Sequence, residues 1–291
     1  MSENPSPNAE SSGSFEIGGE FEVNRLGYGA MRVTGDMVIG EPEDVENSVE
    51  VLRKAVKLGV DFIDTADSYG PGVSERLIRE ALHDGSEDPY DGICVATKGG
   101  LLRSPDGEWL RNSDPDYLTN AALCSIDRLG ADTIDLYQLH RVDEENTVEE
   151  SVHALAELKD EGLINQIGLS EVTVEEIERA SEVVEVATIQ NRYNVADREH
   201  EEVLEYCEKH GIGFIPWFPL NAGNLSSHED DLETVASEHG ASVYQAALAW
   251  LLERSPVTLP IPGTSSLEHL HENVAAAEFE LSSGEMERLK G

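Results

Sequence analysis

The 291-residue sequence predicts a single α/β domain of the (β/α)8, or TIM-barrel, class. Short apolar runs alternate eight times with longer amphipathic runs, which is typical of strands that are each followed by a helix. Strands connected through helices form parallel sheets, and eight such repeats in a chain of this length favour a closed barrel over an open sheet. The first strand–helix turn carries no G-x-G-x-x-G sequence, which argues against a Rossmann fold.

The chain divides into a tail and one domain. Residues 1–14 lack both a basic start and an apolar segment, so we expect a disordered tail rather than a signal peptide. Residues 15–291 form the barrel domain, which begins with an N-terminal β-hairpin. The expected strands are 25–30, 61–65, 92–98, 134–139, 164–169, 187–190, 213–217 and 258–262. The expected helices are 43–58, 74–83, 115–129, 148–161, 174–185, 199–210, 242–254 and 266–277, with an extra C-terminal helix at 283–290.

Capping sequences support several of these helix boundaries. A Ser or Thr followed three residues later by Glu is a capping box, and a Gly just past a helix accepts the left-handed conformation needed there. Capping boxes occur at 147–150, 173–176 and 265–268, and such glycines are Gly59, Gly130, Gly162 and Gly211.

The charge balance is strongly acidic, with 59 Asp and Glu against 20 Lys and Arg and a formal net charge of −39. Nucleic acids and anionic membranes are therefore poor partners, because both bind through clustered basic groups. The acids are spread over the whole chain, which excludes an acidic tail and favours a halophilic protein. At about 1 M salt the screening length falls to about 3 Å, which removes most self-repulsion. We expect the fold to weaken in dilute buffer.

The cysteines and the apolar runs bear on where the protein works. Cys94, Cys124 and Cys207 are few and far apart, which is typical of a reduced, cytoplasmic protein. No apolar run reaches the length of a membrane-spanning helix, so we expect no membrane association.

Four side chains with catalytic chemistry fall where the expected strands end. Asp64 ends the second strand and Tyr69 follows in the next loop, while Lys98 ends the third strand and His140 follows the fourth. Each alone has an ordinary structural explanation, as a turn residue, a packed ring, a surface group or a hydrogen-bonded histidine. In a barrel, however, the carboxyl ends of all strands meet at the face that carries the active site. That shared rim favours a catalytic role.

The four groups suit proton transfer to a carbonyl oxygen. A Tyr phenol has an ordinary pKa of about 10, and the ammonium of Lys98 would lower the pKa of Tyr69 towards a usable acid strength. Asp64 would keep Lys98 protonated, and His140 would donate a hydrogen bond to the substrate oxygen. We expect no metal, because the His residues lack H-x-x-x-H spacing.

A series of motifs carries a family resemblance. In order, they are DFIDTADSYG, ATKGG, DLYQLHRVD, IGLSEV, QNRYN and IPGTSSLEHLHENVAA. With them the chain resembles the aldo-keto reductases of the short-looped prokaryotic type, from about residue 15 to 290. The resemblance implies NADP(H)-dependent reduction of an aldehyde or ketone. It also implies a catalytic tetrad at Asp64, Tyr69, Lys98 and His140.

The resemblance further implies where the nicotinamide binds. Ser170 and Gln190 match residues that contact its carboxamide, and Glu171 stands where the family usually has Asn. Trp217 matches the aromatic side chain on which the ring stacks, although a core Trp is the alternative. The other implied contacts to this half of the cofactor are Gly29, Ala30, Met31, Asp64, Phe218, Leu220 and Gly223.

The adenine end is expected after the eighth strand, at the start of the next helix. Free N–H groups and hydroxyls at a helix N-terminus bind anions, which suits the 2′-phosphate of NADP. Many family members have Lys and Arg where this chain has Gly263 and His269, so use of NAD(H) stays open. The implied contacts are Gly263, Thr264, Ser265, His269, Glu272 and Asn273.

The substrate pocket is expected at the barrel mouth, with Tyr28 and Trp109 as walls beside Tyr69 and His140. Pyridoxal is one candidate among many small aldehydes and ketones, because the chain also resembles pyridoxal reductase-like enzymes. Two other functions stay open: a Schiff-base aldolase that uses Lys98, and a redox-sensing regulatory subunit with little turnover. We expect a monomer or a weak homo-oligomer.

Overall fold

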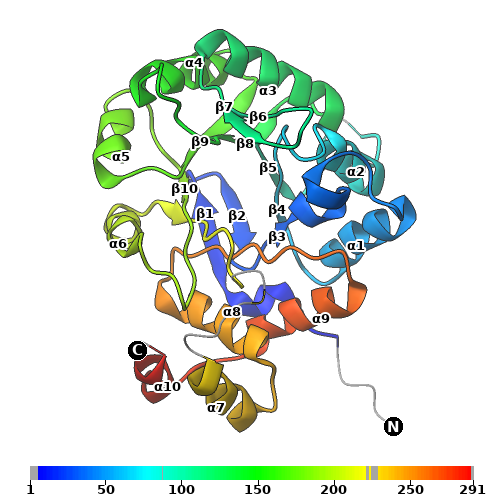
Figure 1. Cartoon of the computed structure of the whole chain (residues 1–291), viewed down its shortest axis with the longest axis vertical. Coiled ribbons are helices and arrows are strands. Elements are labelled where there is room, and N and C mark those ends of the chain that lie inside the picture. The colour runs from blue at the N-terminus through cyan, green and yellow to red at the C-terminus, as the bar shows by residue number, and fades with distance from the viewer. Residues whose placement is uncertain (1–5, 87, 221–222, 224–228, 290–291) are drawn as a thin grey trace.

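A computed structural model describes residues 6–86, 88–220, 223 and 229–289. It confirms the predicted α/β barrel: a curled parallel sheet is surrounded by a ring of helices (Figure 1). The sheet runs in the order β11-β10-β9-β8-β5-β4-β3. Its strands are β3 (Tyr28–Gly29), β4 (Phe62–Asp64), β5 (Cys94–Gly99), β8 (Ile134–Leu139), β9 (Ile164–Ser170), β10 (Thr188–Gln190) and β11 (Gly213–Phe214).

The helices outside the sheet follow the predicted repeats. They are α1 (Val45–Lys57), α2 (Val73–Leu82), α3 (Pro115–Leu129), α4 (Val148–Asp160), α5 (Val174–Ser181), α6 (Glu201–His210), α8 (Val243–Arg254) and α9 (Leu267–Ala275). Two further helices, α7 (Glu229–His239) and α10 (Ser283–Arg288), pack near α8 in Figure 1. The sequence pattern did not predict α7.

The eighth predicted strand, 258–262, is not a regular strand in the structure. Its chain nevertheless lies between β11 and β3. The amide of Leu259 donates to the carbonyl of Phe214 at 2.8 Å, and the amide of Gly27 donates to the carbonyl of Pro260 at 3.0 Å. Pro260 and Pro262 have no N–H group, so a continuous ladder cannot form. The segment therefore closes the barrel with only a few hydrogen bonds.

The N-terminal residues differ from the predicted disordered tail. Ala9–Ser12 form a 3-10 helix, and the Ala9 side chain is fully buried. The amide of Ala9 donates to the carbonyl of Leu58 at 2.8 Å, and the Ser12 hydroxyl accepts from the amide of Leu26 at 3.0 Å. These small side chains fit closely against the barrel, so the segment is packed although it is polar in composition. Residues 1–5 lie outside the described part of the chain.

A hairpin plugs one end of the barrel. The strands β1 (Ser14–Ile17) and β2 (Phe21–Asn24) pair antiparallel around two glycines. Ile17 and Val23 are buried in a cluster with Phe62, Leu136 and Leu259, which come from the interior of the barrel. This apolar plug leaves the carboxyl ends of the strands as the accessible mouth. A short antiparallel ribbon, β6 (Leu101–Arg103) with β7 (Trp109–Arg111), rises beside that mouth.

Candidate active site

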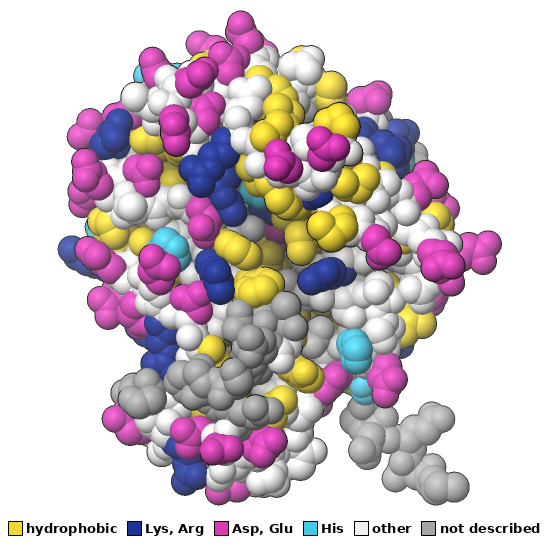
Figure 2. Space-filling view, viewed as in Figure 1, with side chains coloured by type: hydrophobic (Ala, Val, Ile, Leu, Met, Phe, Trp, Pro, Cys, Tyr) yellow, Lys and Arg dark blue, Asp and Glu magenta, His cyan; other side chains and the backbone are white. Residues whose placement is uncertain are grey.

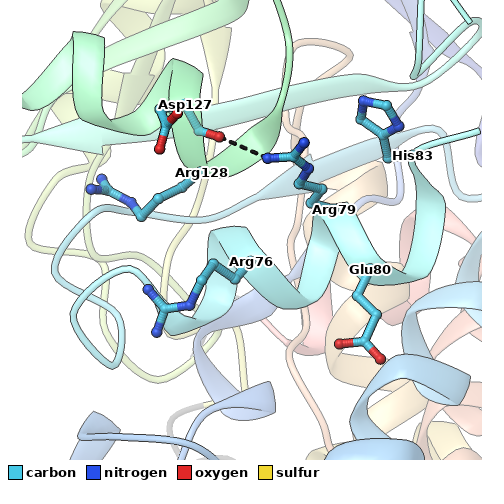
Figure 3. Close-up of a pocket in the computed structure, with 6 residues that line it drawn as sticks. All are labelled: Arg76, Arg79, Glu80, His83, Asp127 and Arg128. Atoms are coloured by element: carbon cyan, nitrogen blue, oxygen red, sulfur yellow. Dashed lines mark hydrogen bonds between the residues drawn. The ribbon is translucent and has the colours of Figure 1, made fainter. Parts of the chain in front are cut away.

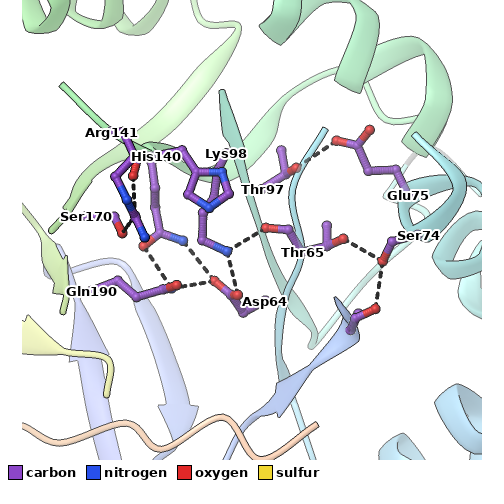
Figure 4. Close-up of polar contacts among 12 residues, drawn as sticks. Asp64, Thr65, Ser74, Glu75, Thr97, Lys98, His140, Arg141, Ser170 and Gln190 are labelled. Atoms are coloured by element: carbon purple, nitrogen blue, oxygen red, sulfur yellow. Dashed lines mark hydrogen bonds and ion pairs between the residues drawn. The ribbon is translucent and has the colours of Figure 1, made fainter. Parts of the chain in front are cut away.

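The structure brings the four predicted catalytic side chains together at the mouth, and Figure 4 shows three of them, Asp64, Lys98 and His140. Asp64 ends β4, Lys98 lies in β5, His140 follows β8, and Tyr69 lies in the loop after β4. Lys98 is fully buried, and the exposed fractions of Asp64, His140 and Tyr69 are 1%, 5% and 8%. Parallel strands place their carboxyl ends on one rim, which explains why residues distant in sequence converge.

Lys98 and Asp64 form a buried ion pair. The Lys98 Nζ donates to Asp64 Oδ2 at 2.6 Å and to the carbonyl of Thr65 at 2.8 Å. The other carboxylate oxygen, Oδ1, accepts from the side-chain amides of Gln138 at 3.0 Å and Gln190 at 2.7 Å. Burial alone would lower the pKa of Lys98, but the charge of Asp64, the interaction with Tyr69 and the hydrogen bonds to both side chains together outweigh burial and raise that pKa. Lys98 therefore stays protonated.

Tyr69 lies beside both Lys98 and His140. Its ring centroid is 5.2 Å from Lys98 Nζ and 5.9 Å from the centre of the His140 ring. The decrease that the sequence predicts from the ammonium of Lys98 is present, but it does not decide the pKa of this phenol. Burial raises the pKa of Tyr69, while the positive charge of Lys98 only partly opposes the increase. Tyr69 is consequently a protonated donor over the physiological pH range.

His140 is a neutral side chain with an unused ring nitrogen. Burial lowers the pKa of His140 well below its usual value, and the charges of Lys98 and Arg141 lower it further. Its Nδ1 atom is buried and has no hydrogen-bond partner among the described residues. Buried polar atoms normally have partners, so a ligand oxygen close to this rim would satisfy the group.

Glu171 adopts a different role from the Asn that the resemblance implies at its position. Its carboxylate accepts from the indole Nε1 of Trp217 at 2.6 Å and from the amide of Arg192 at 2.8 Å. The residue has a φ of +57°, a left-handed conformation that Asn adopts more readily than Glu. The side chain thus fixes the Trp217 ring at the rim of the barrel.

The neighbouring predicted nicotinamide contacts also have protein partners. The Ser170 hydroxyl accepts from Arg141 Nη1 at 2.8 Å, and the Gln190 amide donates to Asp64 as described above. Phe218 has a φ of +63° and its ring lies 5.6 Å from that of Trp217. Ser170, Gln190 and Trp217 therefore line one side of the mouth together with the catalytic residues.

The predicted walls of the substrate pocket differ in position. Trp109, on β7, is 42% exposed and packs edge-to-face with Tyr69 at 6.4 Å. Arg103 lies over the Trp109 ring at 3.7 Å. Tyr28, by contrast, is 1% exposed in the layer between sheet and helices, and its hydroxyl donates to the carbonyl of Thr264. The prediction that Tyr28 lines the substrate pocket is therefore wrong.

The predicted adenine end lies at the start of α9. The N-cap is Ser266 rather than Ser265, since the Ser266 hydroxyl accepts from the amide of His269. Ser265 and His269 are exposed, whereas Asn273 is buried. Of the remaining implied contacts, Thr264 is buried, Glu272 is half-buried, and Gly223 is exposed.

Two of the implied cofactor residues also have a packing role. Gly29 and Gly263 approach so closely that a Cβ on Gly263 would lie 2.5 Å from the carbonyl oxygen of Gly29. Glycine is therefore required where the last barrel segment meets β3. Ala30 is buried, Met31 is half-buried, and Leu220 packs at the edge of the main core.

Sequence reasoning missed Gln138 and Arg141, which flank His140 along the chain. Gln138 lies two residues before His140, so it points to the same side of β8 and reaches Asp64. Arg141 directly follows His140 and contacts Ser170. The alternation of side chains along β8 could have identified Gln138. The direction of the Arg141 side chain, in contrast, depends on packing at the rim.

A separate hollow lies on the outer wall between α2 and α3 (Figure 3). Its lining residues are Arg76, Arg79, Glu80, His83, Asp127 and Arg128. Two of its three arginines have local partners: Arg128 pairs with Glu75, and Arg79 donates to the carbonyl of Asp127 at 3.0 Å. This hollow contains none of the four residues gathered at the mouth.

Within the described ranges, no group of three or more His, Cys, Asp or Glu side chains is arranged to hold a metal ion. No described helix combines the length and apolar character that crossing a membrane would require.

Comparison with known proteins relates this geometry to a family. Residues 25–291 match the family model of the Aldo/keto reductase family. An uncharacterized oxidoreductase of Schizosaccharomyces pombe is 48% identical over 94% of this chain and 88% of its own. The pyridoxine 4-dehydrogenase of Escherichia coli is 41% identical over 97% of this chain and 98% of its own. Among solved structures, this chain is similar to an aldo/keto reductase from Klebsiella pneumoniae in complex with NADP and acetate. The TM-score is 0.81, and the sequences are 27% identical over 95% of this chain and 93% of that one.

Proposed function

The chain belongs to the aldo/keto reductase family, and on that premise we propose that it is an NADP(H)-dependent oxidoreductase that reduces an aldehyde or ketone to an alcohol. The observation that carries the proposal is the buried Lys98–Asp64 pair, which lies beside a protonated Tyr69 and a neutral His140. A protonated phenol and an imidazole at one rim can together bind and protonate a carbonyl oxygen.

The residues of the mouth fit a nicotinamide cofactor. Trp217 offers an indole face fixed by Glu171, and Ser170 and Gln190 offer a hydroxyl and an amide beside it. At the far end, the first turn of α9 presents free N–H groups to a phosphate, as helix N-termini do. Bound NADPH supplies a hydride to the carbonyl carbon.

The protein's own groups handle the oxygen and the proton. His140 can donate an N–H to the carbonyl oxygen and hold it against the Tyr69 hydroxyl. Tyr69 then protonates that oxygen, and the ammonium of Lys98 stabilises the phenolate that remains. Asp64, which Gln138 and Gln190 hold in place, keeps Lys98 charged. The phenol regains its proton from solvent before the next turnover.

We favour NADP(H) over NAD(H), although the chain has no Lys or Arg at Gly263 or His269. Ser265 and His269 are exposed at the start of α9, where they can meet a 2′-phosphate. Ser265→Ala and His269→Ala should raise the Michaelis constant for NADPH more than that for NADH. Equal increases for both nucleotides would place the 2′-phosphate elsewhere.

Pyridoxal is a reasonable first substrate to test because of the name of the Escherichia coli relative. We further propose a cytoplasmic, halophilic enzyme that is a monomer or a weak homo-oligomer. The three cysteines are free thiols, which suits a reducing compartment.

Replacement of Tyr69 by Phe tests the proposed reaction. We expect the rate of NADPH oxidation with pyridoxal or another aldehyde, followed at 340 nm in high salt, to fall by about 10²- to 10⁴-fold, because general acid catalysis is lost. Tyr206→Phe, on the outer helix α6, is the matched control and should retain activity. Unchanged turnover in the Tyr69 variant would assign that ring to packing and defeat the proposal.

Two alternatives predict different results. A Schiff-base aldolase needs a neutral Lys98, yet this amine donates to Asp64 and its pKa is raised. Trapping with borohydride and substrate, without nucleotide, should therefore give no adduct on Lys98. A regulatory subunit would show slow cofactor release and negligible turnover with every carbonyl compound tested.

A further inference from the structure

Arg141 places a positive charge without a direct ion pair beside the catalytic residues. It directly follows His140, and its Nη1 donates to the Ser170 hydroxyl at 2.8 Å (Figure 4). Its charge is close enough to affect the pKa of both Tyr69 and His140. Within the described part of the chain, no carboxylate oxygen lies within the 4.0 Å of an ion pair with its guanidinium.

A second arginine lies at the base of the neighbouring ribbon. Arg111 ends β7. Burial is the main cause that lowers the pKa of Arg141, the charge of Glu171 partly opposes this decrease, and the charge of Arg111 adds a smaller decrease. The backbone explains this proximity: Asn112 donates to the carbonyl of Gly100, and a Cβ on Gly100 would lie 3.2 Å from the carbonyl oxygen of Arg141. The base of the ribbon thus rests against the Arg141 backbone. Arg111 also has no ion-pair partner among the described residues.

Three other basic groups near the mouth are already engaged. Lys98 pairs with Asp64, and Arg192 lies 2.8 Å from Asp197. Arg103 covers the Trp109 ring and donates to two backbone carbonyls. Figure 2 shows several dark-blue basic side chains around the hollow of this face, while most acidic side chains lie towards its periphery.

The lack of a direct ion pair at Arg141 and Arg111 is unusual for this chain. The carboxylate of Glu171 is close enough to raise the pKa of Arg141, but it accepts hydrogen bonds from the Trp217 indole and the Arg192 amide rather than from Arg141. With 59 acidic and 20 basic residues, the sequence has a large excess of potential partners for any arginine. Glu171 offsets part of the positive charge at this partly buried rim, and an anion bound directly to the guanidinium groups would offset more of it. A guanidinium binds a carboxylate or a phosphate through paired N–H groups. The arrangement therefore fits an anionic group on a ligand.

We propose that Arg141 and Arg111 form an anion subsite of the substrate pocket, so that the enzyme prefers carbonyl substrates that carry a carboxylate or a phosphate. Arg141 adjoins His140 and Ser170, which places the subsite next to the reacting carbonyl rather than at α9. The inference deepens the proposed carbonyl reductase function and rests on it. Nε and Nη2 of Arg141 have no acceptor among the described residues and are available to the ligand.

The test compares pairs of substrates in which one member carries an anionic group and the other does not. The pairs are 4-carboxybenzaldehyde with its methyl ester, and pyridoxal 5′-phosphate with pyridoxal, and each is assayed with NADPH at one fixed salt concentration. The wild-type enzyme should have a higher kcat/KM for the anionic member of at least one pair. The pair that shows the preference distinguishes carboxylate from phosphate recognition.

Three variants locate the effect. Arg141→Gln should lower kcat/KM for the preferred anionic substrate by about 10- to 100-fold, as expected for lost hydrogen bonds between charged groups. Its effect on the neutral partner should be much smaller. Arg111→Gln, at an exposed position that tolerates substitution, should show the same selectivity with a smaller loss. Arg53→Gln on the outer helix α1 removes the same charge and should alter neither substrate.

The outcomes separate this inference from the proposed function. If the wild-type enzyme reduces neutral aldehydes but shows no preference in either pair, or if both arginine variants lose activity equally on charged and neutral substrates, the anion subsite is refuted while the reductase function stands. If no carbonyl compound is reduced with NADPH, the proposed function itself fails.

Discussion

Replacing Asp67 with Asn should stabilise the fold at neutral to alkaline pH and change its stability little at acidic pH. Asp67 lies in the loop that presents Tyr69 and is 9% exposed. Its Oδ2 accepts from the Tyr117 hydroxyl at 3.1 Å, whereas Oδ1 is buried and has no partner among the described residues. Burial raises the pKa of Asp67 to about 7, and the negative charge of Glu75 adds to the increase.

The sign of the effect follows from linkage. The folded pKa lies above the ordinary value of 3.8, so the folded state retains a proton that the unfolded state releases. The stability gained from protonated Asp67 is fully present below about pH 4 and is lost as the pH rises through about 7. At about 1.36 kcal/mol per pH unit, the difference corresponds to ~4 kcal/mol. Asn has nearly the same shape and acquires no charge, so the variant keeps its stability as the pH rises.

Thermal unfolding of both proteins, measured from about pH 5 to pH 9 at a constant salt concentration of about 2 M, provides the assay. About two pH units of this change fall between pH 5 and pH 7, which corresponds to about 2.7 kcal/mol. The melting temperature of the variant minus that of the wild type should therefore increase with pH by about 5 °C, at roughly 2 °C per kcal/mol for a chain of this size. Asp106→Asn, at an exposed carboxylate in the β6–β7 turn, is the matched control. A difference that is constant with pH, or that decreases, would refute the reasoning.

Asp64→Asn should lower kcat/KM on the order of 100-fold and move the alkaline limit of activity to lower pH, because the pKa of Lys98 falls without the carboxylate. An unchanged pH profile would contradict this role of Asp64. Glu171→Ala should weaken NADPH binding by about 10-fold, since Trp217 and the amide of Arg192 lose their acceptor. Quenching of tryptophan fluorescence measures the affinity, and an unchanged dissociation constant would show that Glu171 does not position the Trp217 indole for NADPH. Dilution from about 2 M to about 0.1 M salt should lower the melting temperature, and an unchanged melting temperature would remove the case for salt adaptation.

The strongest sequence patterns located the elements accurately. The predicted ranges 115–129 and 134–139 coincide with α3 and β8. Asp114 caps the helix, Gly130 ends it in the left-handed conformation, and the strand is a mainly apolar run interrupted by Asp135 and Gln138. The helix α7 was missed because its acidic sequence carries few apolar side chains. Only a small group around Leu232 and Val235 is buried there, and the helical periodicity is correspondingly weak.

The candidate site was predictable as far as it depends on backbone direction. Asp64, Lys98 and His140 were expected at one rim, because parallel strands share an orientation. Tyr28 was misplaced because successive side chains along a strand alternate between faces. It points outward to Val49 and Leu270 in the layer beneath the helices. The contacts of Glu171 with Trp217 depend on a left-handed backbone at Glu171, which a sequence pattern does not indicate at a Glu.

The basic side chains at the mouth attract an anionic ligand, whereas the acidic surface repels it. In dilute buffer, a net charge of −39 opposes the approach of a phosphate-bearing cofactor and of an anionic substrate. At about 1 M salt the screening length is about 3 Å, so the exposed acids act only over short distances. Lys98 is fully buried and Arg141 is partly buried, so salt screens their fields much less. High salt thus removes the unfavourable field of the surface while the attraction within the site persists, and the Michaelis constants for NADPH and for anionic aldehydes should fall as salt rises. Ordinary enzymes with exposed basic sites show the reverse, because there salt screens the attraction itself.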